Sequence, residues 1–294
     1  MIETKSQPPF AWATIAKPVQ GWQNQDACVC VKSNRGISCG ILDGVGGSID
    51  GGKASHLAER FLFQNFNMSN FNKSPDEIAD RLQGILQLAD RYLKGMTKNG
   101  LSPDAGTTVV AAAVRWPNPG RLPICDVITA WGGDSRAFVL IPNDQLHALT
   151  VDNEVGVTLK GWGMITHRLN RTSQPFLSNL NDAAELDTEE KRRAFFERHI
   201  LEIGLWSDPD SPTPQFAVSM VQVPIGSRVI LTTDGLTDNL RDIEIQEILA
   251  SSRLLEGANA LVEAALARSS SNHLRAKPDD ISCVEIYLDP ALRL

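Results

Sequence analysis

Residues 36–47 read Gly-Ile-Ser-Cys-Gly-Ile-Leu-Asp-Gly-Val-Gly-Gly, an apolar stretch that runs into one aspartate and a glycine-rich loop. We expect a strand over Gly36–Leu42, so that Asp43 stands at its end. The glycines that follow allow the backbone to approach a bound group closely. A carboxylate at a strand end, beside residues without side-chain bulk, suits a hard cation that prefers oxygen ligands. This stretch therefore predicts one part of a metal site built on a sheet.

Three further aspartates stand in comparable places. Asp134 lies in Gly-Gly-Asp-Ser-Arg-Ala and Asp234 in Thr-Thr-Asp-Gly-Leu-Thr-Asp, each after a stretch that we expect to be a strand. Asp279 lies in Lys-Pro-Asp-Asp-Ile-Ser, just before the expected strand Ile281–Leu288. Mg²⁺ and Mn²⁺ bind carboxylates and waters. The four aspartates together predict a site for such an ion, assembled from separate loops.

The apolar periodicity defines the elements of the chain. Strands are expected over Phe10–Lys17, Ala27–Ser33, Gly36–Leu42, Gly106–Arg115, Ile124–Trp131, Ser135–Ile141, Phe216–Val221, Arg228–Thr233 and Ile281–Leu288. Helices are expected around Ala54–Leu62, after an N-cap at Ser74 with Pro75 and Glu77 behind it, near Thr188–Leu201, and at about 242–251 and 256–268.

The order of these elements favours an α+β fold. Alternating βαβ units are missing, which argues against a doubly wound parallel sheet. Two helix pairs each need a sheet face to cover. The expected fold is therefore a four-layer αββα sandwich, in which two antiparallel sheets are flanked by helix pairs. We interpret residues 1–294 as a single domain, with a variable insertion, the flap, at about 152–214.

Composition excludes several classes of function. A net charge of −7 and a pI near 5.3 argue against nucleic acid as the main partner, because phosphate binding needs a basic surface. The N-terminal residues lack a secretory signal, and no apolar run is long enough to span a bilayer. We expect no membrane role and a cytoplasmic location.

The five cysteines are an odd number and include no Cys-x-x-Cys pair. Zinc binding or a disulfide is one interpretation. The favoured one is five small buried side chains in the strands of a protein from a reducing compartment, because free cysteine is among the most buried residue types.

Taken singly, each acidic motif is also compatible with a purely structural role. Asp-Gly at 43–44 or 234–235 is a common turn sequence. Asp134-Ser135-Arg136 could be a structural ion pair at a strand end. Gly52-Lys53-Ala54 lacks the hydroxyl residue of a P-loop, and neither a Rossmann glycine pattern nor a Gly-x-Ser-x-Gly elbow is present.

Taken together, the motifs form a specific succession. They are Asn24-Gln25-Asp26-Ala27, Leu42-Asp43-Gly44-Val45-Gly46-Gly47, Gly106-Thr107-Thr108, Gly133-Asp134-Ser135-Arg136-Ala137, Leu149-Thr150-Val151-Asp152, Ile165-Thr166-His167-Arg168-Leu169, Thr233-Asp234-Gly235-Leu236-Thr237-Asp238 and Asp279-Asp280-Ile281-Ser282. Over about residues 10–288 this succession resembles the metal-dependent protein serine/threonine phosphatases of type 2C (the PPM family), in their bacterial form. The resemblance implies the same sandwich fold.

The resemblance also implies a role for individual residues. Asp43 looks like the carboxylate that bridges two divalent ions, with the Gly44 carbonyl as a further ligand. Asp234 and Asp279 look like the remaining carboxylates on the first ion. Two Mn²⁺ or Mg²⁺ ions are thus the implied cofactors.

Two further aspartates match supporting positions of the family. Asp26 would act with Asp43 in catalysis by orienting a metal-bound water. Asp134 matches the position that, with Asp234, holds a third and weaker ion. The implied activity is hydrolysis of phosphoserine and phosphothreonine on proteins, with a phosphorylated substrate of a serine/threonine kinase as partner.

The sequence departs from the family at three positions. Gln25 replaces a common Glu, and Val45 replaces the histidine of eukaryotic members. Residues 19–22 lack the arginine that grips the substrate phosphate, and Lys17 is the nearest basic group. We hypothesise a high Michaelis constant, which an arginine at Gly21 would lower, or a replacement from the flap such as Arg168 or Arg171.

Two alternatives remain open. A catalytically weak or silent relative would act as a phosphoprotein-binding module. A metal-dependent hydrolase of small phosphoesters would show no dependence of rate on the protein around the phosphate. The retention of all four metal carboxylates favours activity.

Overall fold

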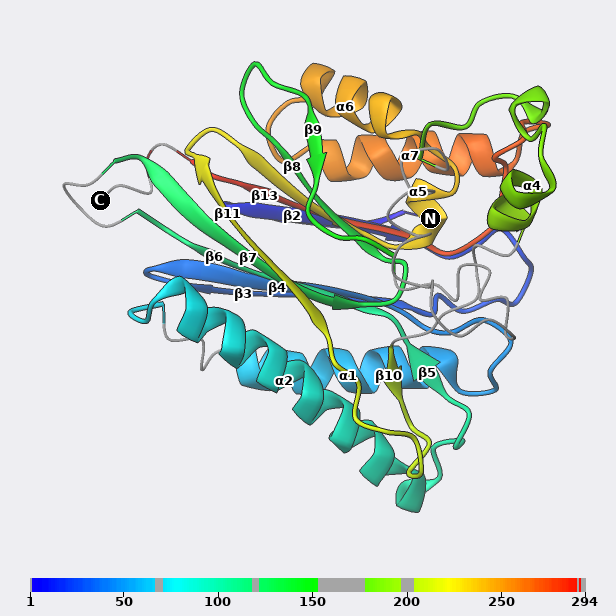
Figure 1. Cartoon of the computed structure of the whole chain (residues 1–294), viewed down its shortest axis with the longest axis horizontal. Helices are drawn as coiled ribbons and strands as arrows, with labels where there is room; N and C mark the ends of the chain where they lie inside the picture. The colour runs from blue at the N-terminus through cyan, green and yellow to red at the C-terminus, as the bar shows by residue number, and fades with distance from the viewer. Residues whose placement is uncertain are drawn as a thin grey trace.

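Two antiparallel sheets lie face to face between two layers of helices (Figure 1). The computed structural model describes residues 2–66, 71–117, 122–152, 178–196, 204–289 and 291. The expected four-layer αββα sandwich of the α+β class is confirmed.

The first sheet has six strands in the order β1-β2-β13-β12-β8-β9. Its strands are β1 (Glu3–Gln7), β2 (Phe10–Ile15), β8 (Arg136–Leu140), β9 (Leu146–Ala148), β12 (Arg228–Thr232) and β13 (Ile281–Tyr287). The second sheet has five strands in the order β11-β7-β6-β4-β3. Its strands are β3 (Asp26–Ser33), β4 (Gly36–Asp43), β6 (Val109–Arg115), β7 (Ile124–Gly132) and β11 (Ala217–Pro224). A short ribbon pairs β5 (Gly106–Thr107) with β10 (Leu205–Trp206).

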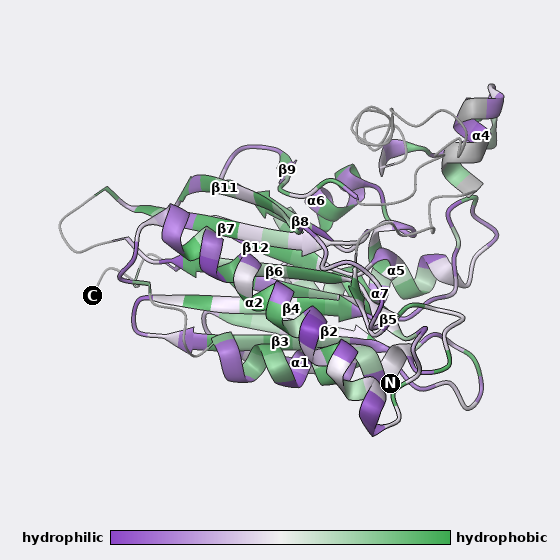
Figure 2. Ribbon diagram, turned by 60° about the horizontal axis from the view of Figure 1, so that its bottom comes forward, coloured by the Kyte–Doolittle hydropathy of each residue, from purple (hydrophilic) through white to green (hydrophobic). Residues whose placement is uncertain are grey.

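The helices form the outer layers. Those of the main sandwich are α1 (Gly51–Phe66), α2 (Pro75–Met96), α5 (Asp234–Thr237), α6 (Asp242–Ser251) and α7 (Gly257–Ser269), and α4 (Glu189–Phe196) lies in the flap. The N-cap of α2 is as expected, because Ser74 accepts a hydrogen bond from the Glu77 amide and the Glu77 carboxylate accepts one from the Ser74 amide. Figure 2 shows hydrophobic residues along the strands and hydrophilic ones on the outer faces of α1 and α2.

Three hydrophobic clusters fill the spaces between the four layers. The α1–α2 layer packs on the second sheet through residues such as Leu62 and Leu86. Ile41 and Val284 belong to the cluster between the sheets. The α6–α7 layer packs on the first sheet around residues such as Leu261. Within one strand, alternate residues point to opposite faces of the sheet and so belong to two different clusters. This alternation is the period-two pattern from which the strands were predicted.

The observed bounds differ from the expected ones mainly at element ends. The expected strand Phe10–Lys17 stops at Ile15, and the expected strand Gly106–Arg115 is divided between β5 and β6. The expected helix at Ala54–Leu62 is longer at both ends, and the expected helix at Thr188–Leu201 is described only as α4, since residues 197–203 lie outside the described part. β1, β9, β10 and α5 were not predicted.

The described part of the flap contacts the main sandwich. β10 pairs with β5, and Leu180, Leu186 and Phe195 form a small cluster with Leu274. The proposed phosphate-binding Arg168 and Arg171 lie outside the described residues. All five cysteines are free thiols in strands, as expected, but burial is confirmed only for Cys39, Cys125 and Cys283, since Cys28 and Cys30 are half-buried. Among the described residues no helix combines the length and the apolar character that crossing a bilayer requires.

Candidate metal centre

Strand pairing brings the predicted acidic residues to one end of the sandwich. Asp26 begins β3 and Asp43 ends β4, and the two residues are directly opposite each other in the ladder. In the other sheet, Thr232 at the end of β12 pairs with both Arg136 and Cys283, so the segments that carry Asp134, Asp234 and Asp279 also meet there. Antiparallel neighbours place the end of one strand beside the start of the next. The carboxylates therefore converge although they are far apart in sequence.

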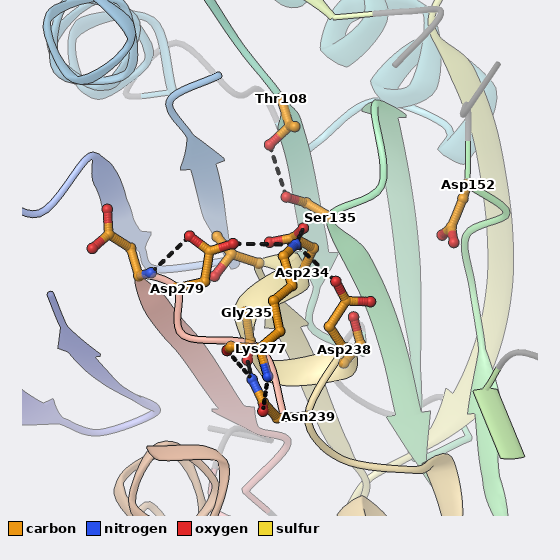
Figure 3. Close-up of polar contacts among 12 residues, drawn as sticks. Thr108, Ser135, Asp152, Asp234, Gly235, Asp238, Asn239, Lys277 and Asp279 are labelled. Carbon is orange, nitrogen blue, oxygen red and sulfur yellow. Dashed lines mark hydrogen bonds and ion pairs between the residues drawn. The ribbon is translucent and has the colours of Figure 1, made fainter. Parts of the chain in front are cut away.

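Two threonines of the Gly-Thr-Thr motif hold Asp43. The Thr107 hydroxyl and the Thr108 amide both donate to the Asp43 carbonyl, each over 2.9 Å. The Asp43 amide donates to the Thr108 hydroxyl oxygen over 3.1 Å. Thr108 also shares a hydrogen bond of 2.7 Å with the Ser135 hydroxyl, next to Asp134 (Figure 3). These contacts fix the backbone of Asp43 relative to the loop that carries Asp134.

Asp26 is tied to the segment that leads to Asp234. Its Oδ2 accepts a 2.9 Å hydrogen bond from the Thr233 hydroxyl, whose oxygen accepts one from the Ser282 amide. Asp26 is 4% exposed, and its Oδ1 has no hydrogen-bond partner in the described part of the chain. One oxygen of this carboxylate is thus fixed and the other is left for a ligand or water.

The Asp-Gly pairs are not simple turns. Asp43 ends a strand, and Asp234 starts the short helix α5. A Cβ at Gly44 would lie 2.6 Å from the Gly51 carbonyl oxygen, and a Cβ at Gly235 would collide with the carbonyl oxygen of Asp280. Both glycines are therefore required for the close approach of backbone segments around the carboxylates.

Lys277 lies at the centre of the acidic cluster, and although it precedes Asp279 in the Lys-Pro-Asp-Asp motif, the sequence did not indicate a role for it. Its ammonium contacts Asp234 Oδ2 at 2.5 Å, Asp238 Oδ2 at 2.8 Å and Asp279 Oδ2 at 3.1 Å. Figure 3 shows its side chain reaching up between Asp279 and Asp238 to Asp234. The contact with Asp234 joins residues that are 43 positions apart in the chain. Only the pairing of the two segments reveals it.

The electrostatics of the cluster are those of crowded carboxylates. Burial first, and then the charges of Asp26, Asp234, Asp134 and Asp279, raise the pKa of Asp43 well above its usual value. Burial and the charge of Asp234 likewise raise the pKa of Asp134 and of Asp279. For Lys277, burial alone would lower the pKa, but the facing carboxylates outweigh it and hold that pKa well above the usual value. The cluster thus favours added positive charge.

The donor set fits a hard divalent cation. Every candidate ligand is an oxygen, and Oδ1 of Asp234, like that of Asp26, is buried without a hydrogen-bond partner in the described residues. As they stand, no three acidic, histidine or cysteine side chains of the described part converge closely enough to hold an ion. The Lys277 ammonium separates three of the carboxylates. The residues therefore suit such an ion once this side chain moves.

Two neighbouring acidic groups have other partners. Arg136, in the Asp-Ser-Arg motif, makes a bidentate ion pair with Asp152 at 2.8 and 2.6 Å, not one with Asp134. Asp280 accepts hydrogen bonds from the amides of Lys17 and Gln25 and from the Trp22 indole. Asp280 thereby anchors residues 17–25 beside Asp279.

The segment without the expected arginine is well defined. The Lys17 ammonium lies 3.4 Å from the centre of the Trp22 ring, a cation–π contact. Gly21 has a φ of +79°, where a residue with a Cβ is strained by about 1–2 kcal/mol. Arginine is therefore better introduced at the exposed Gln20 than at Gly21.

Comparison with known proteins gives a consistent picture. No family model matches the sequence. The serine/threonine phosphatase stp of Listeria innocua serovar 6a is 27% identical over 220 residues, which cover 73% of this chain and 72% of that protein. The solved serine/threonine phosphatase of S. agalactiae has a TM-score of 0.70 at 19% identity, over 98% of this chain and 100% of that chain. The phosphatase PstP, solved with 2 manganese ions, has a TM-score of 0.64 at 18% identity, with the same coverage. These comparisons confirm the resemblance to bacterial serine/threonine phosphatases of the PPM family, and the fold.

Proposed function

We propose that this chain, with its resemblance to type 2C phosphatases, is a metal-dependent protein serine/threonine phosphatase. The convergence of Asp26, Asp43, Asp134, Asp234 and Asp279 at one end of the sandwich carries the proposal. Asp26 and Asp134 are buried and the other three carboxylates are half-buried, so that they repel one another. In the described chain the Lys277 ammonium pairs with only Asp234 and Asp279 of these five, which leaves negative charge for a divalent cation to balance. The similarity to serine/threonine phosphatases supports the same activity.

The acidic residues have separate roles. Asp43 and the Gly44 carbonyl would hold two ions together, and Asp234 and Asp279 would complete the first. Asp134 with Asp234 would hold a third, weaker ion. When bound, two Mn²⁺ or Mg²⁺ ions supply a water of lowered pKa and neutralise charge on the phosphoryl group.

Asp26 is the residue that we assign to positioning the attacking water. Its Oδ2 is fixed by Thr233, so that Oδ1 is presented in a constant direction. Direct attack by water needs no covalent intermediate on the enzyme. The five free thiols support this, since they lie in strands and burial raises the pKa of Cys28, Cys30 and Cys283 well above the usual value.

A groove beside the carboxylates favours a protein substrate. It has a volume of about 550 Å³, and its lining includes Trp22 and Gln25 together with Lys53, His56 and Arg60 of α1. The Gln25 carbonyl accepts a hydrogen bond from the Gly44 amide, so the groove adjoins the site. We propose that it takes the residues that flank a phosphorylated serine or threonine, in a substrate of a serine/threonine kinase.

The test is release of phosphate from a phosphothreonine peptide with Mn²⁺, beside an EDTA control. Asp43→Asn should remove turnover, because it takes away the carboxylate shared by two ions. Asp144→Asn is the matched control, since Asp144 is exposed and pairs only with nearby Gln145 and His147 among the described residues. The control should retain full turnover.

Each alternative has its own result. Equal rates on the peptide and on para-nitrophenyl phosphate, measured as kcat/KM, would favour a hydrolase of small phosphoesters. Folded protein that binds Mn²⁺ and the phosphopeptide without turnover would favour the phosphoprotein-binding module. Turnover that persists in Asp43→Asn would refute the assigned metal centre.

A further inference from the structure

Lys277 makes closer contacts with the predicted metal ligands than any other cation of the described chain. Its ammonium lies 2.5 Å from Asp234 and 3.1 Å from Asp279, which are the two carboxylates assigned to one ion, and 2.8 Å from Asp238. Carboxylate oxygens lie about 2.0–2.1 Å from a bound Mg²⁺ and turn their lone pairs toward it. The same oxygens cannot serve the ammonium and the ion in this way at once.

The position of Lys277 is built into the fold. Asn239, which is fully buried, accepts a hydrogen bond from the Lys277 amide over 3.0 Å and donates one to its carbonyl over 2.9 Å. The same Asn239 amide donates over 2.8 Å to the carbonyl of Gly235, the residue after Asp234. A single side chain thus joins the backbone of Lys277 to the short helix α5, which begins at Asp234. The ammonium is therefore held within reach of the carboxylates.

The side chain, unlike the backbone, has access to solvent. It is 27% exposed, while its backbone is clamped by Asn239. A lysine has a flexible stem of four carbons, so the ammonium can swing to solvent without a change in the backbone.

We propose that Lys277 is a resident counter-ion of the Asp234–Asp279 half of the site, which a divalent ion must displace in order to bind there. The inference rests on the metal dependence of the proposed function. It predicts that Lys277 sets the ion concentration at which this half of the site fills. It also explains how the carboxylates remain together before an ion arrives.

The first experiment measures Mn²⁺ binding by calorimetry in chelator-treated protein, without substrate. Lys277→Gln retains hydrogen-bonding capacity and removes the charge. It should bind Mn²⁺ at least about tenfold more tightly at one site, because a charge-assisted contact no longer has to be broken. Lys73→Gln is the matched control, since Lys73 pairs with Glu77 at 2.9 Å on α2 and should bind as the parent protein does. Unchanged or weaker affinity in Lys277→Gln would overturn the proposal.

A second experiment uses the parent protein, so that it does not depend on how Lys277→Gln folds. Amine-reactive labelling followed by peptide mass spectrometry reports the reactivity of each lysine. Saturating Mg²⁺ should increase labelling of Lys277 severalfold and leave that of Lys73 unchanged. Labelling of Lys277 that stays constant or falls would refute displacement.

The inference and the proposed function fail differently. Mn²⁺-dependent phosphate release together with unchanged affinity in Lys277→Gln would refute the counter-ion role alone. If neither the parent protein nor Lys277→Gln binds Mn²⁺, both proposals are wrong.

Discussion

Replacement of Thr108 by valine should separate the support of the site from the stability of the sheets. Thr108 is 2% exposed, and valine has nearly its shape, so no cavity is made. The change removes the acceptor of the Asp43 amide at 3.1 Å and the partner of the Ser135 hydroxyl at 2.7 Å. A buried polar group that loses its partner costs about 1–3 kcal/mol. For two such groups, partly offset by the apolar methyl that valine adds, we expect the free energy of unfolding to fall by about 2–4 kcal/mol.

Thr129→Val is the matched control. Thr129, in β7, is also a buried threonine, but its hydroxyl has no hydrogen-bond partner among the described residues. Removal of an unpaired buried hydroxyl should leave stability unchanged or raise it by about 1 kcal/mol. The two variants thus make the same chemical change with opposite expected results.

Urea denaturation in EDTA would measure the free energies of unfolding. Thr108→Val should also require more Mn²⁺ for half-maximal phosphate release, because the Asp43 backbone is less firmly held, whereas Thr129→Val should not. A loss below about 0.5 kcal/mol in Thr108→Val, or equal losses in both variants, would refute this account of how Asp43 is positioned.

Two further changes test other parts of the structure. Burial raises the pKa of Glu244, but the Arg241 amide and the guanidinium of Arg268 outweigh it and lower that pKa from 4.5 to about 2. The stabilisation by the Glu244 carboxylate is therefore present above pH 4.5 and is lost as the pH falls toward 2. In urea titrations, Glu244→Gln should lower the free energy of unfolding by about 1–2 kcal/mol at pH 7 and by almost nothing at pH 2. Equal losses at both pH values would contradict this, and Glu247→Gln, an exposed site on the same helix, is the control. Gln20→Arg should lower the KM for a phosphopeptide about three- to tenfold by supplying the missing guanidinium, with kcat little changed; an unaltered KM would show that the phosphate is bound elsewhere.

The fold was predictable to the extent that its signals are local. The Ser74 cap and the change of apolar period mark α2 and the main strands, and both depend on residues within one or two turns of one another. β1 was missed because every residue of Glu3–Gln7 is exposed, so it carries no apolar alternation. β10 and α5 are too short to show a periodic pattern of apolar residues. Such elements are defined by the neighbour on which they pack.

The site was predictable only in part, for the same reason. Asp43, Asp134, Asp234 and Asp279 stand out because each lies at a strand end in an unusual local sequence. Asp26 and the assigned roles came from the resemblance to a family. The contact between Asp280 and the Gln25 amide joins residues 255 positions apart, so no local sequence pattern predicts it. Polar networks that close across two sheets follow from the register of pairing and not from composition.

The structure separates what fixes the geometry of the site from what adjusts its charge. Asp43 is held through its backbone by Thr107, which ends β5, and by Thr108, which directly precedes β6 of the second sheet. The framework of the carboxylates is thus as stable as the sheets, whatever ion is present. Lys277 differs from the two threonines in how it is held. Its backbone is fixed by Asn239, but its ammonium is attached only by ion pairs. A substitution there can change the affinity for a divalent ion without moving Asp43, whereas a change at Thr108 alters the geometry together with the stability. Metal affinity and fold are consequently adjustable by different residues in this protein.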